Sequence, residues 1–193
     1  MMNKEQIKLR SMILTALFAA IIGIMAQLTI PLPLVPITGQ TLAIGLAATI
    51  LGSKYGTLSV LLYLVIGSAG VPVFAEFSAG ISKLIGPTGG FLVGFLPATF
   101  IMGIYLEKLG FTFKHALIAN IIGMLITLFF GTIWLKISAA LSWTAAFTSG
   151  FIPFLLVGMI KAGLASWLGV LIRKRLIQAK LLFTAKTDIQ RSL

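Results

Sequence analysis

Long apolar runs, each nearly free of charge, constrain the fold of this chain more than any other feature. Of its 193 residues 59% are hydrophobic, the mean hydropathy is +1.09, and only 10% are charged. Soluble domains carry about 25% charged residues, so runs of this kind are typical of membrane spans. The length allows about six spans of roughly 20 residues each. We therefore predict an all-α integral membrane protein, a compact bundle of six helices that forms a single domain over residues 1–193.

Prolines and small polar turns divide the apolar runs into helices. We expect helices over 11–30, 41–52, 57–69, 91–106, 117–135 and 151–172, followed by a basic tail over 173–193. Pro31, Pro33 and Pro36 separate the first helix from the second, because prolines this close cannot be helical. The second helix is short for a full crossing. The first could be the core of a signal peptide, but it is too long and no cleavage site precedes a soluble chain, so we expect an anchor.

The basic residues lie mostly on one side of the predicted spans. Of the 15 Lys and Arg, three fall in outer or embedded segments, namely Lys83, Lys136 and Lys161. The inner segments hold the other twelve: Lys4, Lys8, Arg10, Lys54, Lys108, Lys114, Arg173, Lys174, Arg175, Lys180, Lys186 and Arg191. Cytoplasmic loops carry such an excess, so we expect both termini in the cytoplasm. The basic tail is then expected to touch anionic membrane lipid and not nucleic acid.

A polar, irregular segment over 70–90 separates the third and fourth predicted helices. It contains Pro72, Pro87, Glu76 and Lys83, and it ends in the glycine-rich run GPTGG, which includes Thr88. A segment of this kind cannot lie in hydrocarbon, because its backbone groups would have no hydrogen-bond partners. We expect it to form the lid of a binding site at the outer face.

Lys161 lies about ten residues into the last predicted span. A charge at that depth is costly, so such a group normally faces a cavity or a partner. No Asp or Glu falls in any predicted span. An anion arriving from outside is therefore the partner that we expect, with a structural ion pair and snorkelling to the surface as the alternatives.

Three other features have both a structural and a functional interpretation. The buried hydroxyl of Tyr63 is expected to find a partner, which is either protein or ligand. Ala16 and Ala20 form a small-xxx-small face, which serves internal helix packing or contact with another protein. Asn120 lies near the inner end of the fifth predicted span.

The sequence offers no group of residues suited to catalysis. It has no cysteine, one peripheral histidine and four acids dispersed along the chain. Acid–base, metal and nucleophilic chemistry need clusters that are missing, so we predict no enzyme, no metal and no cofactor. No G-x-x-x-x-G-K-[ST] loop is present, so ATP-driven movement of a solute would need a partner. A proton-coupled carrier would ordinarily show acids within its spans.

Several segments, in the same order along the chain, resemble the BioY family. They are 36–42 (PITGQTL), 59–67 (SVLLYLVIG), 70–74 (GVPVF), 86–91 (GPTGGF), and Pro153-Phe154 ahead of Lys161. The resemblance extends over roughly 16–173. It implies a membrane protein of a prokaryotic cell that captures biotin as the substrate-binding subunit of an energy-coupling factor transporter.

The resemblance also implies partners and positions. The partners are a membrane-embedded coupling subunit, contacted by Ala16 and Ala20, and two ATPase subunits. The ligand is expected under the loops 31–40 and 70–90, with Lys161 matching the lysine with which the family faces its ligand. The predicted substrate-binding residues are Lys161, Glu76, Phe74, Phe77, Thr38, Gln40, Tyr63, Thr88, Gly158 and Asn120.

One position departs from the family. The family usually has an aspartate three residues before the lysine, where this chain has Gly158. An aspartate can accept hydrogen bonds from the N–H groups of a ureido ring and glycine cannot. Either another acceptor such as Glu76 replaces it, or the ligand is a different ring-bearing carboxylate such as lipoate. A structural membrane subunit without a ligand, and a carrier that works alone, are the competing hypotheses.

Overall fold

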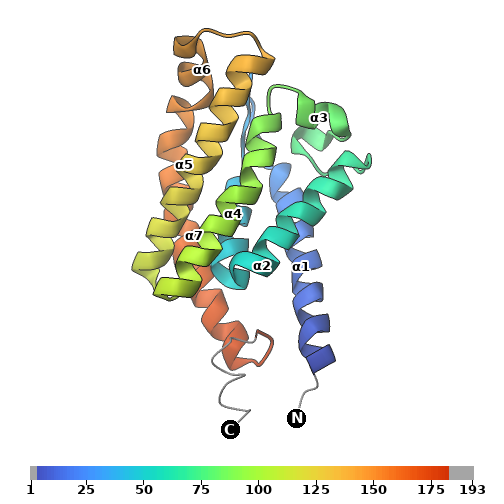
Figure 1. Cartoon of the computed structure of the whole chain (residues 1–193), viewed down its shortest axis with the longest axis vertical. Helices are drawn as coiled ribbons and strands as arrows, with labels where there is room; N and C mark the ends of the chain where they lie inside the picture. The colour runs from blue at the N-terminus through green and yellow to red at the C-terminus, as the bar shows by residue number, and fades with distance from the viewer. Residues whose placement is uncertain (1–3, 183–193) are drawn as a thin grey trace.

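The computed structural model describes residues 4–182 of the chain as an all-helical bundle, which confirms the predicted fold class. Its long helices run side by side along the long axis (Figure 1). They are α1 (Lys4–Ala26), α2 (Gln40–Ser68), α4 (Gly89–Leu109), α5 (Phe113–Ser138) and α7 (Ile152–Gln178). Lys186 and Arg191 of the predicted basic tail lie outside the described residues.

Helix α2 contains two of the predicted spans. Gly52 has φ 80° and ψ −166°, which is not helical, and it divides α2 into arms over 40–51 and 53–68. These arms match the second and third predicted spans. In the described part of the chain, five helices are therefore long and apolar enough to cross a membrane, where the sequence predicts six.

Charged side chains complete the backbone hydrogen bonds at this break. Glu107 of α4 accepts hydrogen bonds from the Ser53 backbone N–H at 2.7 Å and from its hydroxyl at 2.8 and 2.9 Å. The guanidinium of Arg173 donates to the carbonyl of Ile50 and stacks on the Phe111 ring at 3.4 Å. An anion at the start of one arm and a cation at the end of the other suit the dipoles of both helices.

A short hairpin replaces helix between α1 and α2. Strands β1 (Thr29–Ile30) and β2 (Ile37–Thr38) pair antiparallel, so α1 ends at Ala26 and not at residue 30 as predicted. The prolines that follow Ile30 remove the N–H donors that a continuing helix needs. Pairing with β2 satisfies the backbone of this segment instead.

The loops at the outer end hold more helix than the sequence predicts. The lid segment contains η1 (Ala75–Phe77) and α3 (Ile81–Ile85), and the predicted loop 136–150 contains α6 (Trp143–Gly150). Ser142 caps α6, because its hydroxyl accepts a hydrogen bond from the Ala145 N–H at 3.2 Å. At the other end of the molecule α7 continues to Gln178, six residues beyond the predicted boundary at 172.

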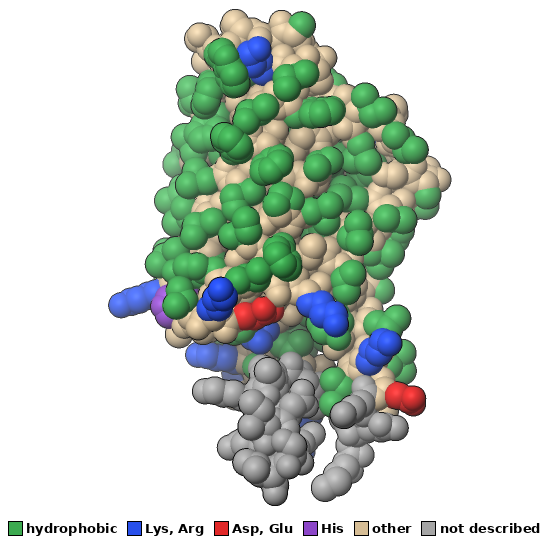
Figure 2. Space-filling view, in the orientation of Figure 1, with side chains coloured by type: hydrophobic (Ala, Val, Ile, Leu, Met, Phe, Trp, Pro, Cys, Tyr) green, Lys and Arg blue, Asp and Glu red, His purple; other side chains and the backbone are tan. Residues whose placement is uncertain are grey.

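The first and last helices meet at the same end of the bundle. Arg10 of α1 donates a hydrogen bond to the carbonyl of Lys180, just after α7, at 2.8 Å. Figure 2 shows apolar side chains over the flank of the bundle and most Lys and Arg near this end. The arrangement fits an even number of crossings; the cytoplasmic location of this end stays a prediction from the charge distribution.

We predict that Gly52→Ala destabilises the protein by about 1–3 kcal/mol, because a side chain is strained at this φ and ψ. Its Cβ would also lie 2.4 Å from the Glu107 carboxylate that caps the second arm. Thermal unfolding in detergent measures the effect. Gly163→Ala in α7 is the control, because nothing lies within 4 Å of its added Cβ. It should leave stability unchanged or raise it by up to about 1 kcal/mol. Equal unfolding temperatures for the two variants would contradict the role given to Gly52.

Candidate ligand-binding site

A cavity of about 490 Å³ opens at the outer end of the bundle. That volume lies within the range of small-molecule pockets. Its walls come from the hairpin, the first arm of α2, the lid segment, α4, α5 and α7. Most of the lining is aliphatic or aromatic, with a few polar groups between.

The short first arm of α2 explains why the cavity lies here. At 1.5 Å per residue the arm 40–51 spans about 18 Å, less than the roughly 30 Å of a bilayer core. The hairpin and the residues 31–36 within it supply the remainder of the crossing. Non-helical backbone at membrane depth is tolerated where it lines a cavity, and Leu32 to Pro36 line this one.

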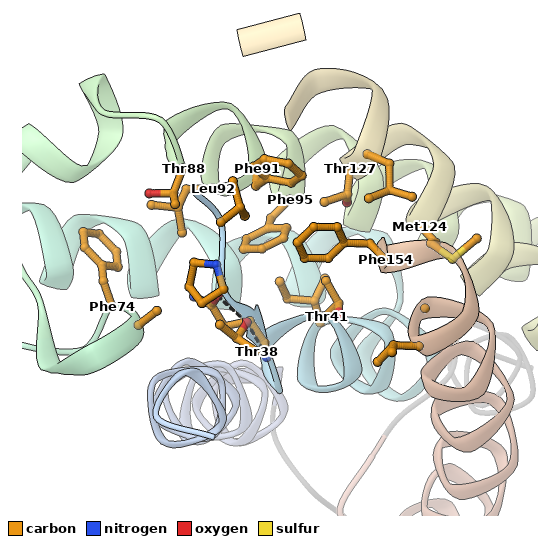
Figure 3. A pocket seen from close by; sticks show the side chains of 18 of the residues that line it. Thr38, Thr41, Phe74, Thr88, Phe91, Leu92, Phe95, Met124, Thr127 and Phe154 are labelled. Atoms are coloured by element: carbon orange, nitrogen blue, oxygen red, sulfur yellow. Dashed lines mark hydrogen bonds between the residues drawn. The ribbon is translucent and has the colours of Figure 1, made fainter. Parts of the chain in front are cut away.

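Aromatic rings form two opposite sides of the cavity. Figure 3 shows Phe91, Phe95 and Phe154 grouped on one side, Phe74 on the other, and Thr38 and Thr41 between them. The rings of Phe91 and Phe154 lie 5.9 Å apart, centre to centre. Phe74 is 1% exposed, and its edge packs against Tyr63 at 5.4 Å. The rings leave a space suited to an apolar or ring-shaped ligand.

Lys161 places its ammonium group in the wall of the cavity. Its Nζ donates to the Thr38 carbonyl at 2.6 Å and to the Thr41 hydroxyl at 3.3 Å. An ammonium carries three N–H donors, so one remains for a ligand. Among residues 4–182 no acid forms an ion pair with it. The structural ion pair considered from the sequence is therefore not found in the described part of the chain.

Gln40 connects the hairpin to the interior of the bundle. Its side-chain oxygen accepts a hydrogen bond from the Thr38 hydroxyl at 2.7 Å, and its side-chain nitrogen donates to the hydroxyl of Tyr63. Thr38 and Gln40 line the cavity, whereas Tyr63 lies behind it, 1% exposed. The partner of the Tyr63 hydroxyl is thus protein, one of the two alternatives left open by the sequence.

The lid segment places its predicted residues in different environments. Phe74, Glu76 and Thr88 line the cavity, and the carboxylate of Glu76 is exposed at its mouth. Phe77 is 73% exposed and is not part of the lining. Glu76 and Phe77 both have positive φ, 59° and 51°, an uncommon conformation for residues other than glycine.

Gln27, directly after α1, fastens the lid segment to that helix. Its side-chain nitrogen donates to the carbonyls of Gly23 and Phe74, both at 3.0 Å. Its side-chain oxygen accepts a hydrogen bond from the Phe77 N–H at 2.8 Å. Gln27 could not be identified from the sequence, because no spacing links it to a loop that begins more than 40 residues later.

Gly158 lines the cavity opposite Met124 of α5. A Cβ at Gly158 would lie 2.4 Å from the Met124 sulfur. The methionine therefore occupies the space that a side chain at 158 would need. At the position where the family usually has an aspartate, this chain therefore has a glycine, and the space beside that glycine is filled by Met124.

Asn120, the last of the predicted site residues, lines the deep part of the cavity and is 5% exposed. It lies on one stripe of α5 with Gly123, Met124, Thr127 and Leu128, at helical spacing. That spacing is the signal that could have predicted the stripe. However, α5 is apolar on all sides, so the sequence does not distinguish the cavity-lining face from the others. Other lining residues were not predicted from the sequence as part of the site, namely Thr41, Phe91, Phe95, Met124, Thr127 and Phe154.

Ala16 and Ala20 lie on the exposed side of α1. Their neighbours Ala19 and Gly23 face inward; Ala19 is 4% exposed, and a Cβ at Gly23 would lie 3.3 Å from the Val73 side chain. Internal packing within residues 4–182 therefore does not use the Ala16–Ala20 face. It is free for lipid or for another protein.

We predict that Gln27→Leu loosens the lid segment without unfolding the bundle. Each lost hydrogen bond contributes about 0.5–1.5 kcal/mol, so amide exchange at Phe77 should accelerate roughly three- to tenfold. Hydrogen exchange followed by mass spectrometry measures it. The control is Gln178→Leu, an exposed glutamine at the end of α7, which should leave exchange in 73–78 unchanged. Unchanged exchange in Gln27→Leu would contradict the fastening role.

Comparisons with known proteins agree on one family. The model of the BioY family matches residues 1–178. The chain is 41% identical over 180 residues to the "Biotin transporter BioY2" of Lactococcus lactis subsp. cremoris, covering 93% of this chain and 99% of that one. It is 36% identical over 169 residues to the "Probable biotin transporter BioY" of Pyrococcus horikoshii, covering 88% of this chain and 97% of that one.

A solved structure has the same fold. It is described as the S-component for biotin from an ECF-type ABC transporter, where ECF stands for energy-coupling factor. It superposes with a TM-score of 0.82 at 30% identity, over 90% of this chain and 95% of the other.

Proposed function

This chain belongs to the BioY family, and we propose that it captures biotin at the outer face of a prokaryotic plasma membrane, as the S component of an energy-coupling factor transporter. The free donor of Lys161 is the observation that supports this proposal most directly. A carboxylate placed beside it forms a charge-assisted hydrogen bond, and no acid among residues 4–182 is paired with this ammonium. The aromatic walls then receive the ring system and the aliphatic tail.

Capture requires that the lid segment opens and closes over the cavity. Phe74 is held in the core against Tyr63, whereas no residue over 75–88 is buried, which is typical of segments that open locally. The proposed residues around the ligand are Lys161, Thr38, Gln40, Phe74, Glu76, Thr88, Gly158 and Asn120. Tyr63 acts through Gln40, and Phe77 acts only if the lid rearranges on closing.

Delivery across the membrane is proposed to depend on partner subunits. The exposed small face of α1, Ala16 and Ala20, lets another helix approach closely, which suits contact with a membrane-embedded coupling subunit. Two ATPase subunits would supply the energy, because the sequence has no phosphate-binding loop of its own.

The first test is a titration of the purified protein in detergent with biotin and, separately, with lipoate. Tight binding of biotin and weaker binding of lipoate is the expected result. Lipoate is the alternative that Gly158 favours, because Gly158 and Met124 offer no hydrogen-bond acceptor to a ureido ring. Preference for lipoate would overturn the assignment of biotin, and binding of neither would favour a structural subunit.

We predict that Lys161→Met weakens biotin binding roughly tenfold to a hundredfold, the effect of a charge-assisted hydrogen bond. Calorimetric titration measures it. Lys83→Met is the matched control, since Lys83 also lines the cavity but is exposed at its mouth. Its loss should weaken binding less than about fivefold, because exposed charges contribute little. A larger effect at Lys83 than at Lys161 would place the carboxylate at the mouth instead.

We also predict that Ala20→Trp abolishes biotin uptake by cells but leaves biotin binding to the purified protein unchanged. The large ring would keep a coupling subunit away from α1 while lying outside the cavity. Uptake of labelled biotin and titration of the purified variant are the two measurements. Val93→Trp, at an exposed position of α4, is the control and should retain uptake. Normal uptake by Ala20→Trp would argue against this docking face.

A further inference from the structure

The deep wall of the cavity contains a hydrogen-bond acceptor with a fixed orientation, the side-chain oxygen of Asn120. Three acceptors surround the side-chain nitrogen: the carbonyl of Ala116 at 2.9 Å, the Thr49 hydroxyl at 3.1 Å and the Ser166 hydroxyl at 3.2 Å. A backbone carbonyl can only accept, so the atom that faces Ala116 must be the nitrogen. The amide therefore cannot be flipped, and Oδ1 points the other way.

Gly45 of α2 leaves the space in which this oxygen lies. A Cβ at Gly45 would lie 2.2 Å from Asn120 Oδ1, so any other residue would displace it. Gly45 and Asn120 both line the cavity. No residue among 4–182 donates a hydrogen bond to this oxygen. The oxygen is not among the fully buried side-chain atoms without a partner, so it is accessible from the cavity. A ligand that fills the cavity without an N–H group would bury this acceptor unpaired, whereas a ligand with an N–H group bonds to it.

Apart from hydroxyl groups such as those of Thr88 and Thr127, which can donate as well as accept, the other side-chain acceptors of the lining are already used or lie elsewhere. The side-chain oxygen of Gln40 accepts from Thr38, and the Thr41 hydroxyl accepts from Lys161. The Glu76 carboxylate is exposed at the mouth, on the lid. Asn120 Oδ1 is thus an acceptor in the deep part of the site whose orientation is fixed and to which no residue among 4–182 donates.

We propose that Asn120 Oδ1 accepts a hydrogen bond from a ureido N–H of biotin and so determines the preference for ligands with an N–H in the ring. The inference rests on the proposed function. Thr41, which contacts the Lys161 ammonium, and Gly45, which faces Asn120 Oδ1, lie four residues apart on α2, about 6 Å along the helix axis. The carboxylate binds at the outer of these levels and the ring at the deeper one, joined by the flexible aliphatic chain of biotin.

In this arrangement the acceptor for the ring N–H comes from Asn120 of α5, because Gly158 of α7 has no side chain that could provide one. Met124, one turn along α5 from Asn120, fills the space beside Gly158. The ring is therefore directed past Met124 towards Asn120. A carboxylate whose ring has no N–H leaves Oδ1 without a donor and is disfavoured.

The test compares biotin with N,N′-dimethylbiotin, in which methyl groups replace both ureido N–H groups. Calorimetric titrations use the full-length protein in detergent, as wild type, Asn120→Leu and Asn120→Asp. A site built to bond an N–H strongly rejects the analogue without it, so the wild type should prefer biotin by about tenfold or more. Asn120→Leu keeps a similar volume without an acceptor and should bring the ratio close to one. Asn120→Asp keeps an acceptor but places a second oxygen beside the Ala116 carbonyl, so it should weaken the binding of both ligands while retaining the preference for biotin.

A purely structural role for Asn120 predicts a different outcome: both ligands weaken by the same factor and their ratio is unchanged, which would overturn the inference. So would a wild type that binds both ligands equally. Failure of the wild type to bind biotin at all would refute the proposed function itself, a separate result. If Asn120→Leu does not fold, Asn120→Ala replaces it, because the Ser166 hydroxyl already donates to the Ala162 carbonyl at 2.6 Å and remains satisfied.

Discussion

The rest of this structure depends on the hydrogen bonding of one stretch of backbone that is not helical. Between Ala26 and Gln40 the chain forms a hairpin at a depth where water is scarce, so its polar groups need protein partners. They are supplied by the pairing of β1 with β2, by the hydrogen bond from the Gly39 N–H to the Leu28 carbonyl, and by the Lys161 ammonium at the Thr38 carbonyl. The cavity lies against this segment, and the Lys161 ammonium in the cavity wall bonds to the hairpin at the Thr38 carbonyl.

At the opposite end of the bundle, the break at Gly52 also leaves backbone groups that need hydrogen-bond partners. A helix that reverses direction exposes carbonyl groups on one side of the turn and N–H groups on the other. Arg173 and Glu107 bond to these groups, and each side chain is held by helices that also form walls of the cavity. The two arms of α2 are thereby fixed relative to α4 and α7, so the cavity has defined dimensions before a ligand arrives.

Hydropathy and charge were sufficient to predict the helical membrane fold, and the segments 36–42, 59–67, 70–74 and 86–91 were sufficient to predict the BioY family; both predictions are confirmed. Lys161 could be identified because an unpaired charge in an apolar run is conspicuous. Gln27, Met124 and the capping role of Glu107 could not be predicted, because each depends on a contact between segments far apart in sequence. The hairpin and α6 were missed for a related reason: short elements in outer loops are stabilised by local pairing and capping, which hydropathy does not report.

Gln27 has a thermodynamic consequence for a protein that works with partners. The residue belongs to the end of the helix that carries Ala16 and Ala20, and it bonds directly to the segment that covers the cavity. If a partner docks on Ala16 and Ala20 as proposed, a shift of α1 would change the stability of the closed lid, and closing of the lid would change the preferred position of α1. Linkage makes such effects reciprocal: the factor by which docking alters affinity for the solute equals the factor by which the solute alters docking.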